Sequence, residues 1–315
     1  MILSSPVLRI GKYSIVKQLG EGTTSNVYLA IHDDSFASVA IKQLRKSWQA
    51  DIHKAMFADE VELGRKMTHK NIIRVLDADL NEKSGAYLVM EYINGVSLDH
   101  HEQADNLLPT RTVLSVIEQT AKALRYAAKL DVVHRDVKPG NLILKSDGAV
   151  KLADFGCAIP VSLTGSVVAG SLAYMSPEQL EGEPLDQRAD IYSLGAVLYR
   201  LLTGKPTFEA DNTFDARVAI LNFPIVPIEN YRKALPPELI KVINRSLEKS
   251  LVDRYANWDE FIRDFGEAAH VIRMSDYDMD SYRGFSMSTQ SVLSDYMSTD
   301  RAFSRSGFSR STMLN

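Results

Sequence analysis

Cysteine, long apolar runs and blocks of basic residues are all scarce in this chain of 315 residues. Cys157 is the only cysteine, so no disulfide can form within the chain and a reducing compartment is expected. No apolar run reaches the roughly 18 residues that a membrane-spanning helix needs. Lys and Arg form no block of five or more and the net charge is −4, so nucleic acid and anionic membranes are not indicated as partners. The first residues also lack the features of a signal peptide, and we expect a cytoplasmic protein.

The chain does contain enough apolar material for a large core, since 45% of its residues are hydrophobic. β-Branched and aromatic runs predict strands at 15–19, 27–31, 39–44 and 87–90. The spacing of apolar residues predicts helices over 50–67, 191–202, 239–247 and 258–265, with one more apolar helical stripe from 113 to 130. The predicted class is α+β, with a small lobe of strands and one main helix before a larger helical lobe.

The composition changes near Ser275. Residues 275–315 contain eleven serines but no lysine and no proline. Such a segment cannot bury enough apolar area to offset its chain entropy, so the sequence predicts a disordered tail over 273–315. Two stretches rich in hydroxyl groups, 284–289 and 307–312, repeat imperfectly within it. The tail is therefore a candidate for autophosphorylation or for docking a partner.

Two motifs carry a recognisable set of chemical groups. They are His134-Arg135-Asp136-Val137-Lys138-Pro139-Gly140-Asn141 and Asp154-Phe155-Gly156. Transfer of a phosphoryl group from a nucleotide to a hydroxyl needs a carboxylate that accepts the hydroxyl proton, a role that suits Asp136. It also needs a cation beside the moving phosphate and oxygen ligands for Mg²⁺, which Lys138, Asn141 and Asp154 supply. A surface-loop aspartate is the alternative for Asp136, and the order and spacing of its neighbours disfavour it.

Further segments follow in an order found in one enzyme family. They are the glycine-rich run Gly20-Glu21-Gly22-Thr23-Thr24-Ser25-Asn26-Val27, the strand Val39-Ala40-Ile41-Lys42, Ser176-Pro177-Glu178, and Asp190-Ile191-Tyr192-Ser193-Leu194-Gly195. From about residue 13 to about residue 272 the chain resembles eukaryotic-like Ser/Thr protein kinases, and several segments are similar to those of bacterial members. The resemblance implies a bilobal kinase fold with an N-terminal extension at 1–12, an N-lobe at 13–92 and a C-lobe at 95–272. It also implies ATP and Mg²⁺ as cofactors and protein Ser or Thr side chains as acceptors.

The resemblance assigns catalytic roles to Asp136, Lys138, Lys42 and Glu60. Lys42 would bind the α- and β-phosphates and pair with a helix glutamate, for which Glu60 fits the register better than Glu62. Gly64 stands where family members usually have an apolar residue, and glycine costs a helix about 1 kcal/mol relative to alanine, so we expect a mobile helix. The metal ligands would be Asn141 and Asp154. The residues expected to bind the nucleotide are Leu19, Gly20, Glu21, Gly22, Val27, Ala40, Lys42, Met90, Glu91, Tyr92, Ile143 and Asp154.

The resemblance also implies regulation by phosphorylation. An arginine at position 135 would pair with a phosphate on the loop that follows the Asp-Phe-Gly motif. That loop offers Ser162, Thr164 and Ser166, and the candidate phosphosites are Thr164 and Ser166.

Other residues are expected to hold the site together. Ser171 would link the base and the lysine of the catalytic run. Glu178 and Arg254 would form a buried ion pair, and Asp190 would bond the backbone near His134. Cys157 is either a small buried hydrophobe, the favoured interpretation, or a site of oxidation or alkylation.

Three other functions remain open at this point. The first is a pseudokinase that binds ATP as a scaffold, although every catalytic position is filled. The second is a kinase of small molecules on a related fold, which would lack the Ser-Pro-Glu segment and the substrate loop at 170–174. In the third, the C-terminal tail is the functional part and the kinase domain carries it.

Overall fold

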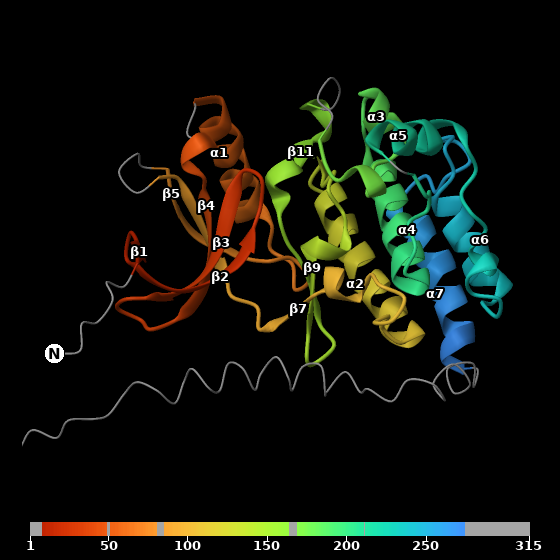
Figure 1. Cartoon of the computed structure of the whole chain (residues 1–315), viewed down its shortest axis with the longest axis horizontal. Coiled ribbons are helices and arrows are strands. Elements are labelled where there is room, and N and C mark those ends of the chain that lie inside the picture. Colours follow the sequence, from red (N-terminus) through yellow and green to blue (C-terminus); the bar gives the residue numbers. More distant parts are fainter. Residues whose placement is uncertain (1–7, 49–50, 81–84, 164–168, 211, 275–315) are drawn as a thin grey trace, which may run out of the picture.

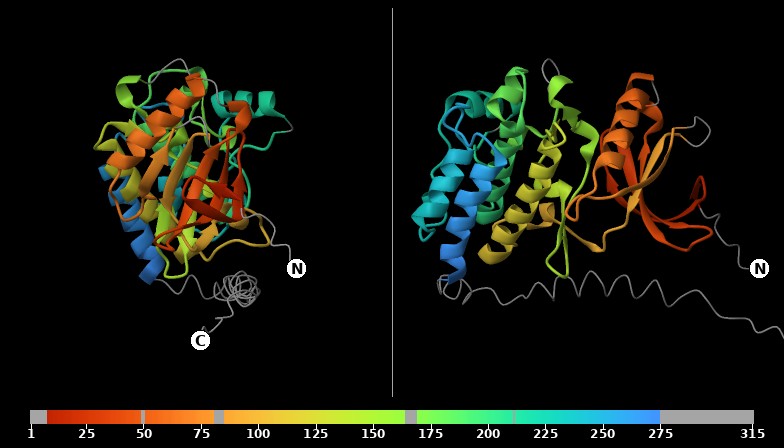
Figure 2. Two further views of the ribbon diagram at one scale, coloured as in Figure 1. Left: turned by 90° about the vertical axis from the view of Figure 1, so that its left-hand side faces the viewer. Right: turned by 180° about the vertical axis from the view of Figure 1, so that it is seen from behind.

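The computed structural model describes residues 8–48, 51–80, 85–163, 169–210 and 212–274. Two lobes lie side by side, the first built mainly of strands and the second mainly of helices (Figure 1). The view from behind shows the same division (Figure 2). The predicted α+β class and the bilobal arrangement are therefore confirmed.

The N-lobe contains an antiparallel sheet of six strands in the order β1-β2-β3-β4-β6-β5. In chain order these are β1 (Arg9–Ile10), β2 (Tyr13–Glu21), β3 (Ser25–His32), β4 (Ser38–Leu44), β5 (Val75–Asp79) and β6 (Tyr87–Glu91). The four predicted strands lie within β2, β3, β4 and β6. The sheet begins in the expected N-terminal extension, because β1 pairs with β2. The sequence did not predict β5, since two of its five residues are aspartates, which are depleted in strands.

One helix, α1 (Asp51–Lys66), crosses this sheet, as the apolar spacing predicted. It contacts β5 and the 3-10 turn η4 (Phe155–Cys157) of the C-lobe. Phe57 and Val61 of α1 pack in one core cluster with Leu44 and Leu88 of the sheet. The helix is therefore anchored to the sheet on one side and to the motif that contains Asp154 on the other.

Gly64 lies where α1 comes closest to β5. A Cβ at this position would lie 2.5 Å from Cγ2 of Val75, well inside van der Waals contact. The missing side chain thus lets the helix and the strand approach each other. The sequence suggested a weak point in the helix, whereas the structure gives this glycine a packing role.

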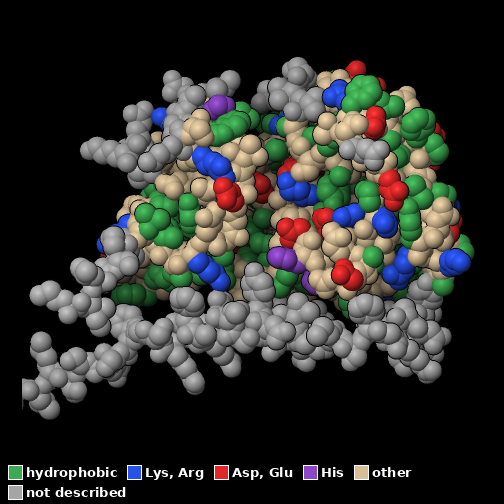
Figure 3. Space-filling view, in the orientation of Figure 1, with side chains coloured by type: hydrophobic (Ala, Val, Ile, Leu, Met, Phe, Trp, Pro, Cys, Tyr) green, Lys and Arg blue, Asp and Glu red, His purple; other side chains and the backbone are tan. Residues whose placement is uncertain are grey.

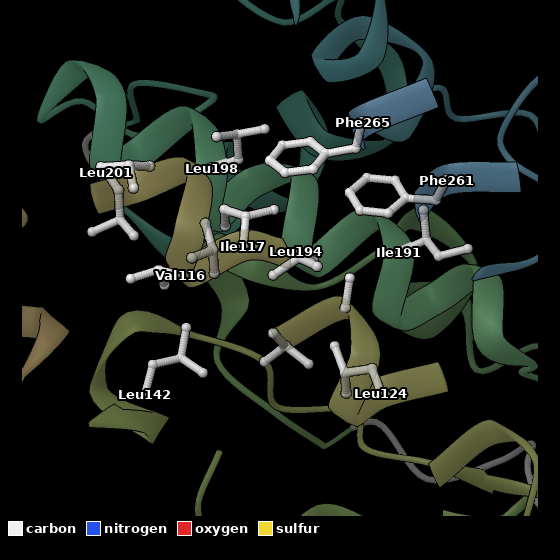
Figure 4. Packing of buried hydrophobic residues seen from close by; sticks show 14 of the residues in the cluster. Val116, Ile117, Leu124, Leu142, Ile191, Leu194, Leu198, Leu201, Phe261 and Phe265 are labelled. Atoms are coloured by element: carbon white, nitrogen blue, oxygen red, sulfur yellow. The ribbon is translucent and has the colours of Figure 1, made fainter. Parts of the chain in front are cut away.

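The core of the C-lobe is built on four helices, α2 (Thr110–Ala128), α4 (Gln187–Thr203), α6 (Pro237–Ser246) and α7 (Trp258–Met274). Helix α4 is buried along most of its length and contacts the other three. Figure 4 shows part of this core, in which Ile117 of α2 and Leu198 of α4 lie near Phe265 of α7. Two further helices, α3 (Pro177–Glu181) and α5 (Thr213–Asn222), lie together at one end of the lobe (Figure 1). Within the described ranges, no helix combines the length and the apolar character needed to cross a membrane.

Two helix boundaries differ from the predictions. The expected stripe on α2 included Leu130, but the helix ends at Ala128 and the Leu130 side chain is 44% exposed. Helix α7 was predicted to end at residue 265, but it continues to Met274. Ala269 and Ile272 are buried on its inner face, so the apolar spacing extends about two turns further than was recognised.

The short strands and 3-10 turns of both lobes were not predicted. They are the strands β7 (Gly95–Ser97), β8 (Val132–Val133), β9 (Leu142–Lys145), β10 (Val150–Leu152) and β11 (Ile159–Pro160), with the 3-10 turns η1 (Lys46–Trp48), η2 (Leu98–His101), η3 (Pro139–Asn141), η5 (Val161–Leu163), η6 (Leu172–Tyr174) and η7 (Ile228–Asn230). The hairpin of β9 and β10 pairs Leu142 with Leu152. The N–H of Ala153 donates to the carbonyl of Asn141 at 2.9 Å. This hairpin therefore brings the two expected metal ligands, Asn141 and Asp154, to the same place.

Candidate active site

The catalytic run is held in place by Asp190 of α4. Its two carboxylate oxygens accept hydrogen bonds from the backbone N–H groups of His134 at 2.8 Å and Arg135 at 2.9 Å. Arg135 has φ +66°, a left-handed conformation that is costly for a residue with a side chain. The two bonds to a buried carboxylate stabilise this turn, and the predicted role of Asp190 is confirmed. His134 packs edge-on against Phe155, as expected of a scaffold residue.

Asp136 follows directly and is only 7% exposed. One of its oxygens, Oδ2, lies 2.7 Å from Nζ of Lys138 and accepts a hydrogen bond from Nδ2 of Asn141 at 3.1 Å. Lys138 also donates to Oγ of Ser171 at 2.9 Å, which confirms the predicted contact with the lysine; the predicted bond from Ser171 to Asp136 is not among the described hydrogen bonds. The second oxygen, Oδ1, is buried and no residue in the described part of the chain bonds to it. A fixed carboxylate with one unpaired oxygen can accept a proton from an incoming hydroxyl.

Lys42 joins the two lobes. Its Nζ lies 2.6 Å from Oε1 of Glu60 on α1 and 2.6 Å from Oδ1 of Asp154 in the C-lobe. The competing acid, Glu62, pairs instead with Lys66 on the outer face of the helix. Burial alone would lower the pKa of Lys42, but the two carboxylates outweigh it and raise that pKa. Lys42 in turn lowers the pKa of Asp154 to about 2, so this carboxylate is ionised at neutral pH.

Asp154 begins the turn η4 in a left-handed conformation, with φ +62°. Its Oδ1 accepts the hydrogen bonds of Lys42 and of the Gly156 N–H. The side chain remains 41% exposed, which leaves its other oxygen for a ligand. A Cβ on Gly156 would lie 2.9 Å from Nζ of Lys42 and 3.1 Å from Oε2 of Glu60, so a larger residue here would displace the charged groups of this ion-pair network.

The donors at this place suit Mg²⁺. The amide nitrogen of Asn141 donates two hydrogen bonds to Asp136, one to its backbone carbonyl and one to Oδ2 of its side chain. The amide oxygen of Asn141 and the outer oxygen of Asp154 therefore remain for a metal. Carboxylate and amide oxygens are ligands that Mg²⁺ prefers, commonly together with substrate phosphates.

The expected nucleotide-binding residues come from neighbouring strands. The register places Ala40 of β4 opposite Met90 of β6, and Val27 of β3 opposite Lys42. Residues 20–22 lie at the β2–β3 hairpin, where Gly20 pairs with Val27 and the Gly22 N–H donates to the Ser25 carbonyl. Ile143 is supplied by β9 of the C-lobe. Leu19 is 42% exposed, the most open of these apolar positions.

Glu91 is more constrained than the sequence suggested. Its N–H donates to the carbonyl of Arg74 at 3.0 Å, so this N–H is not available to a ligand. Its side chain lies 2.5 Å from Nζ of Lys151 and also accepts from the Arg74 N–H. This fixes the chain at the end of β6, just before it enters the C-lobe through Tyr92.

The surface between the lobes is hollowed. Figure 3 shows a depression there, with acidic and basic side chains on both rims. Lys42 belongs to β4 of the N-lobe, and Asp136 lies in the loop after β8 of the C-lobe. The site therefore has the form of a cleft with charged groups from both lobes.

Comparison with known proteins gives this geometry a family. The model of the protein kinase domain matches residues 13–284. The chain belongs to the protein kinase family. A probable serine/threonine-protein kinase of Clostridium acetobutylicum is 34% identical over 257 residues, which cover 80% of this kinase chain and 39% of the relative. Serine/threonine-protein kinase PknB of Mycolicibacterium smegmatis is 33% identical over 263 residues, which cover 80% of this chain and 42% of the relative.

A third relative is the serine/threonine-protein kinase PrkC of Bacillus subtilis, 31% identical over 271 residues, which cover 84% of this chain and 42% of the relative. The kinase chain thus spans about two fifths of the length of these relatives. The matches support the predicted resemblance to bacterial Ser/Thr kinases.

Some residues at the kinase site were missed from the sequence. Gln179 donates to the carbonyl oxygens of Arg135 and Ala169, and Lys151 holds the side chain of Glu91. Tyr174 donates to Glu102 at 3.0 Å, which ties the substrate loop to the start of the C-lobe. These contacts join residues far apart in the chain. Tyr174 belongs to the substrate loop and Gln179 follows the Ser-Pro-Glu segment, but neither segment indicates which distant residue its side chain bonds.

The candidate phosphosites Thr164 and Ser166 lie outside the described residues, and so does the tail from 275 onward. Arg135, which is expected to pair with a phosphate on that loop, lies within the described residues. It is 6% exposed, and its Nε donates to the carbonyl of Cys157.

Gly64 gives a prediction about how α1 is positioned. Gly64→Leu is expected to lower the free energy of unfolding by about 1–3 kcal/mol, because the added side chain would overlap Val75. It should also move Glu60 away from Lys42. Urea unfolding measures the first effect. The matched control is Gly266→Leu in α7, where a Cβ meets nothing within 4 Å, so its stability should not fall. Equal losses for both variants would contradict the packing role of Gly64.

Cys157 gives a prediction about pH. Burial, followed by the nearby charges of Asp136 and Asp154, raises the pKa of its thiol to about 11 from an ordinary 9.0. The proton is therefore retained at pH 8, and we expect alkylation by iodoacetamide about a hundredfold slower than for an ordinary thiol. The rate should rise as the pH approaches 11. The same chain in urea is the control, because it has no other cysteine. Rapid labelling of the native protein at pH 8 would contradict this.

Proposed function

We propose that the chain is a serine/threonine protein kinase. This transferase would move the γ-phosphate of ATP to protein hydroxyls, a phosphorylation reaction used in signalling. The observation that carries the proposal is how the carboxylate of Asp136 is buried and hydrogen-bonded. Its carboxylate is fixed by Lys138 and Asn141 through one oxygen, while the other is buried and unpaired within the described chain. Family membership and the names of the relatives support the same reaction.

The N-lobe would bind the nucleotide. Ala40, Val27 and Met90 supply apolar walls, and Lys42 supplies a cation for the phosphates. Asn141 and Asp154 would hold Mg²⁺, which neutralises phosphate charge when it is bound. The pairing of Lys42 with Glu60 and Asp154 keeps the ammonium charged and aimed into the cleft.

The acceptor hydroxyl would sit against Oδ1 of Asp136, which orients it and takes its proton. The acceptor oxygen then forms a bond to the γ-phosphorus while the bond from that phosphorus to the bridging oxygen breaks, and ADP leaves. Lys138 lies beside Asp136 and donates to Ser171 of the substrate loop, so its charge is available to the transferred phosphoryl group. This lysine is the feature that favours Ser or Thr over Tyr as the acceptor.

The test uses the purified chain with ATP labelled in the γ-phosphate, Mg²⁺ and myelin basic protein. We expect label in phosphoserine or phosphothreonine of the acceptor. The Lys42→Met variant should give none. Label only in phosphotyrosine would overturn the acceptor assignment. Binding of ATP without any transfer would favour the alternative, an ATP-binding pseudokinase scaffold.

We also propose that the kinase is regulated by autophosphorylation of Thr164 or Ser166, with Arg135 as the group that pairs with the phosphate. The serine-rich tail is a further proposed substrate or docking segment, and the single cysteine favours a cytoplasmic location. Mass spectrometry of active enzyme is the test of the first idea. An unmodified loop at 162–166 in fully active protein would end it.

A further inference from the structure

Gln179 of α3 bridges the two loops that meet at the candidate active site. Its side chain is buried, with 2% of the residue exposed. The amide nitrogen Nε2 donates to the carbonyl of Arg135 at 2.7 Å and also to the carbonyl of Ala169. The first carbonyl directly precedes Asp136. The second lies two residues before Ser171.

The backbone is shaped to allow this bridge. Gly170 has φ +120°, a conformation open to glycine but not to residues with a side chain. A Cβ there would overlap the carbonyl oxygen of Arg135 and lie 2.9 Å from Nε2 of Gln179. At Gly170 the substrate loop therefore approaches the catalytic loop closely, with the carbonyl of Arg135 and the amide of Gln179 as its nearest neighbours.

Two bridges thus cross between the same two loops. One is made of side chains and runs from Asp136 through Lys138 to Ser171. The other runs from the carbonyl of Arg135 through Gln179 to the carbonyl of Ala169. The first includes groups assigned to the chemistry, whereas Gln179 contacts only backbone oxygens.

We propose that Gln179 is a positioning residue that sets the separation of the substrate loop from the catalytic loop, so that a bound peptide presents its hydroxyl to Asp136. A neutral amide suits this task. It places two N–H donors on one nitrogen against two buried carbonyls, and it adds no charge beside Asp136. Each carbonyl would otherwise lose its partner, and buried carbonyls are almost always bonded.

The proposed role of Gln179 affects how the peptide acceptor is used and not how the nucleotide is bound. The nucleotide phosphates would meet Lys42 and Asp154, neither of which touches Gln179 in its described hydrogen bonds. A change at Gln179 should therefore weaken use of the protein acceptor and leave use of ATP intact. A loss of folded protein would instead lower both together.

The experiment compares Gln179→Met, which removes both donors at similar length, with wild type. We expect kcat/KM for myelin basic protein to fall about tenfold or more, the size typical of losing the partners of buried polar groups. The KM for ATP and the slow hydrolysis of ATP without acceptor should not change. The matched control is Gln187→Met, which removes an acceptor for the backbone N–H of Trp258 in the same lobe and, in its described hydrogen bonds, touches neither loop. That control should leave the peptide parameters unchanged.

A second variant tests the role through the pH dependence of KM, which a purely structural role would not change. Gln179→Glu has no donor when ionised but regains one when it is protonated, and burial favours the protonated form. Its KM for the acceptor protein should therefore improve as the pH falls from 8 to 6, relative to Gln179→Met. Equal loss of acceptor use and ATP hydrolysis in both variants, or normal acceptor kinetics in both, would overturn the proposal.

The inference rests on the proposed kinase function, and the outcomes separate the two. If the wild-type chain transfers no phosphate, the proposed function fails. If the wild type is active and the Gln179 variants match it, only the positioning role fails.

Discussion

Asp136→Asn is expected to reduce phosphorylation of the acceptor protein by about a thousandfold, within the range of 10²–10⁴ that a positioned general base contributes. The substitution keeps the shape of the side chain but replaces the proton-accepting carboxylate with an amide. The buried Oδ1 is the atom that matters, since Oδ2 already receives Lys138 and Asn141. Nucleotide affinity should stay within about twofold, because the groups assigned to ATP lie elsewhere. Acceptor phosphorylation and a nucleotide-binding titration measure the two effects.

The matched control is Asp131→Asn, an exposed position that precedes the catalytic run. Asp131 has φ +55°, a conformation that asparagine tolerates well, so folding and activity should both be retained. If Asp136→Asn kept a tenth or more of the wild-type rate, another group would have to accept the proton. The assignment of the base would then be wrong.

Much of this site could be predicted from the sequence because its parts are local. The run from His134 to Asn141 lies in one loop, and a short β-hairpin leads from it to Asp154. The number of residues between these groups therefore determines how far apart they lie in the folded protein. The choice of Glu60 over Glu62 is also local, since helical periodicity decides which acid faces the sheet. The observed pairs of Lys42 and of Lys66 agree with it.

Other features depend on how distant backbones meet, and no pattern in the sequence reports that. Gln179 reaches a carbonyl 44 residues earlier in the chain, and its role depends on backbone oxygens that any residue could supply. The packing of Gly64 was not predicted, because helix propensity describes an isolated helix, whereas its close neighbour Val75 lies on another element. Strand β5 was missed for a related reason. Its pairing with β6 overrides the weak strand preference of its aspartates.

The largest effect on stability is expected from Arg254→Met, which should lower the free energy of unfolding by about 3–5 kcal/mol. Arg254 is 1% exposed and binds both carboxylate oxygens of Glu178, at 2.7 and 3.1 Å. Its guanidinium also donates to the backbone carbonyls of Arg188, Glu248 and Lys249. The variant leaves a buried carboxylate and three carbonyls without this partner. Urea unfolding followed by circular dichroism measures the loss.

Two comparisons separate the buried pair from a general effect of removing an arginine. Arg263→Met breaks a pair with Asp264 in which the arginine is 60% exposed, and it should cost less than about 1 kcal/mol. Adding Glu178→Met to Arg254→Met removes the stranded carboxylate and should recover part of the lost stability, though not the part due to the three carbonyls. A double variant less stable than Arg254→Met alone would show that desolvation of Glu178 is not the cause. Because Glu178 neighbours Gln179 on α3, the same Arg254 variant should also raise the KM for the acceptor protein.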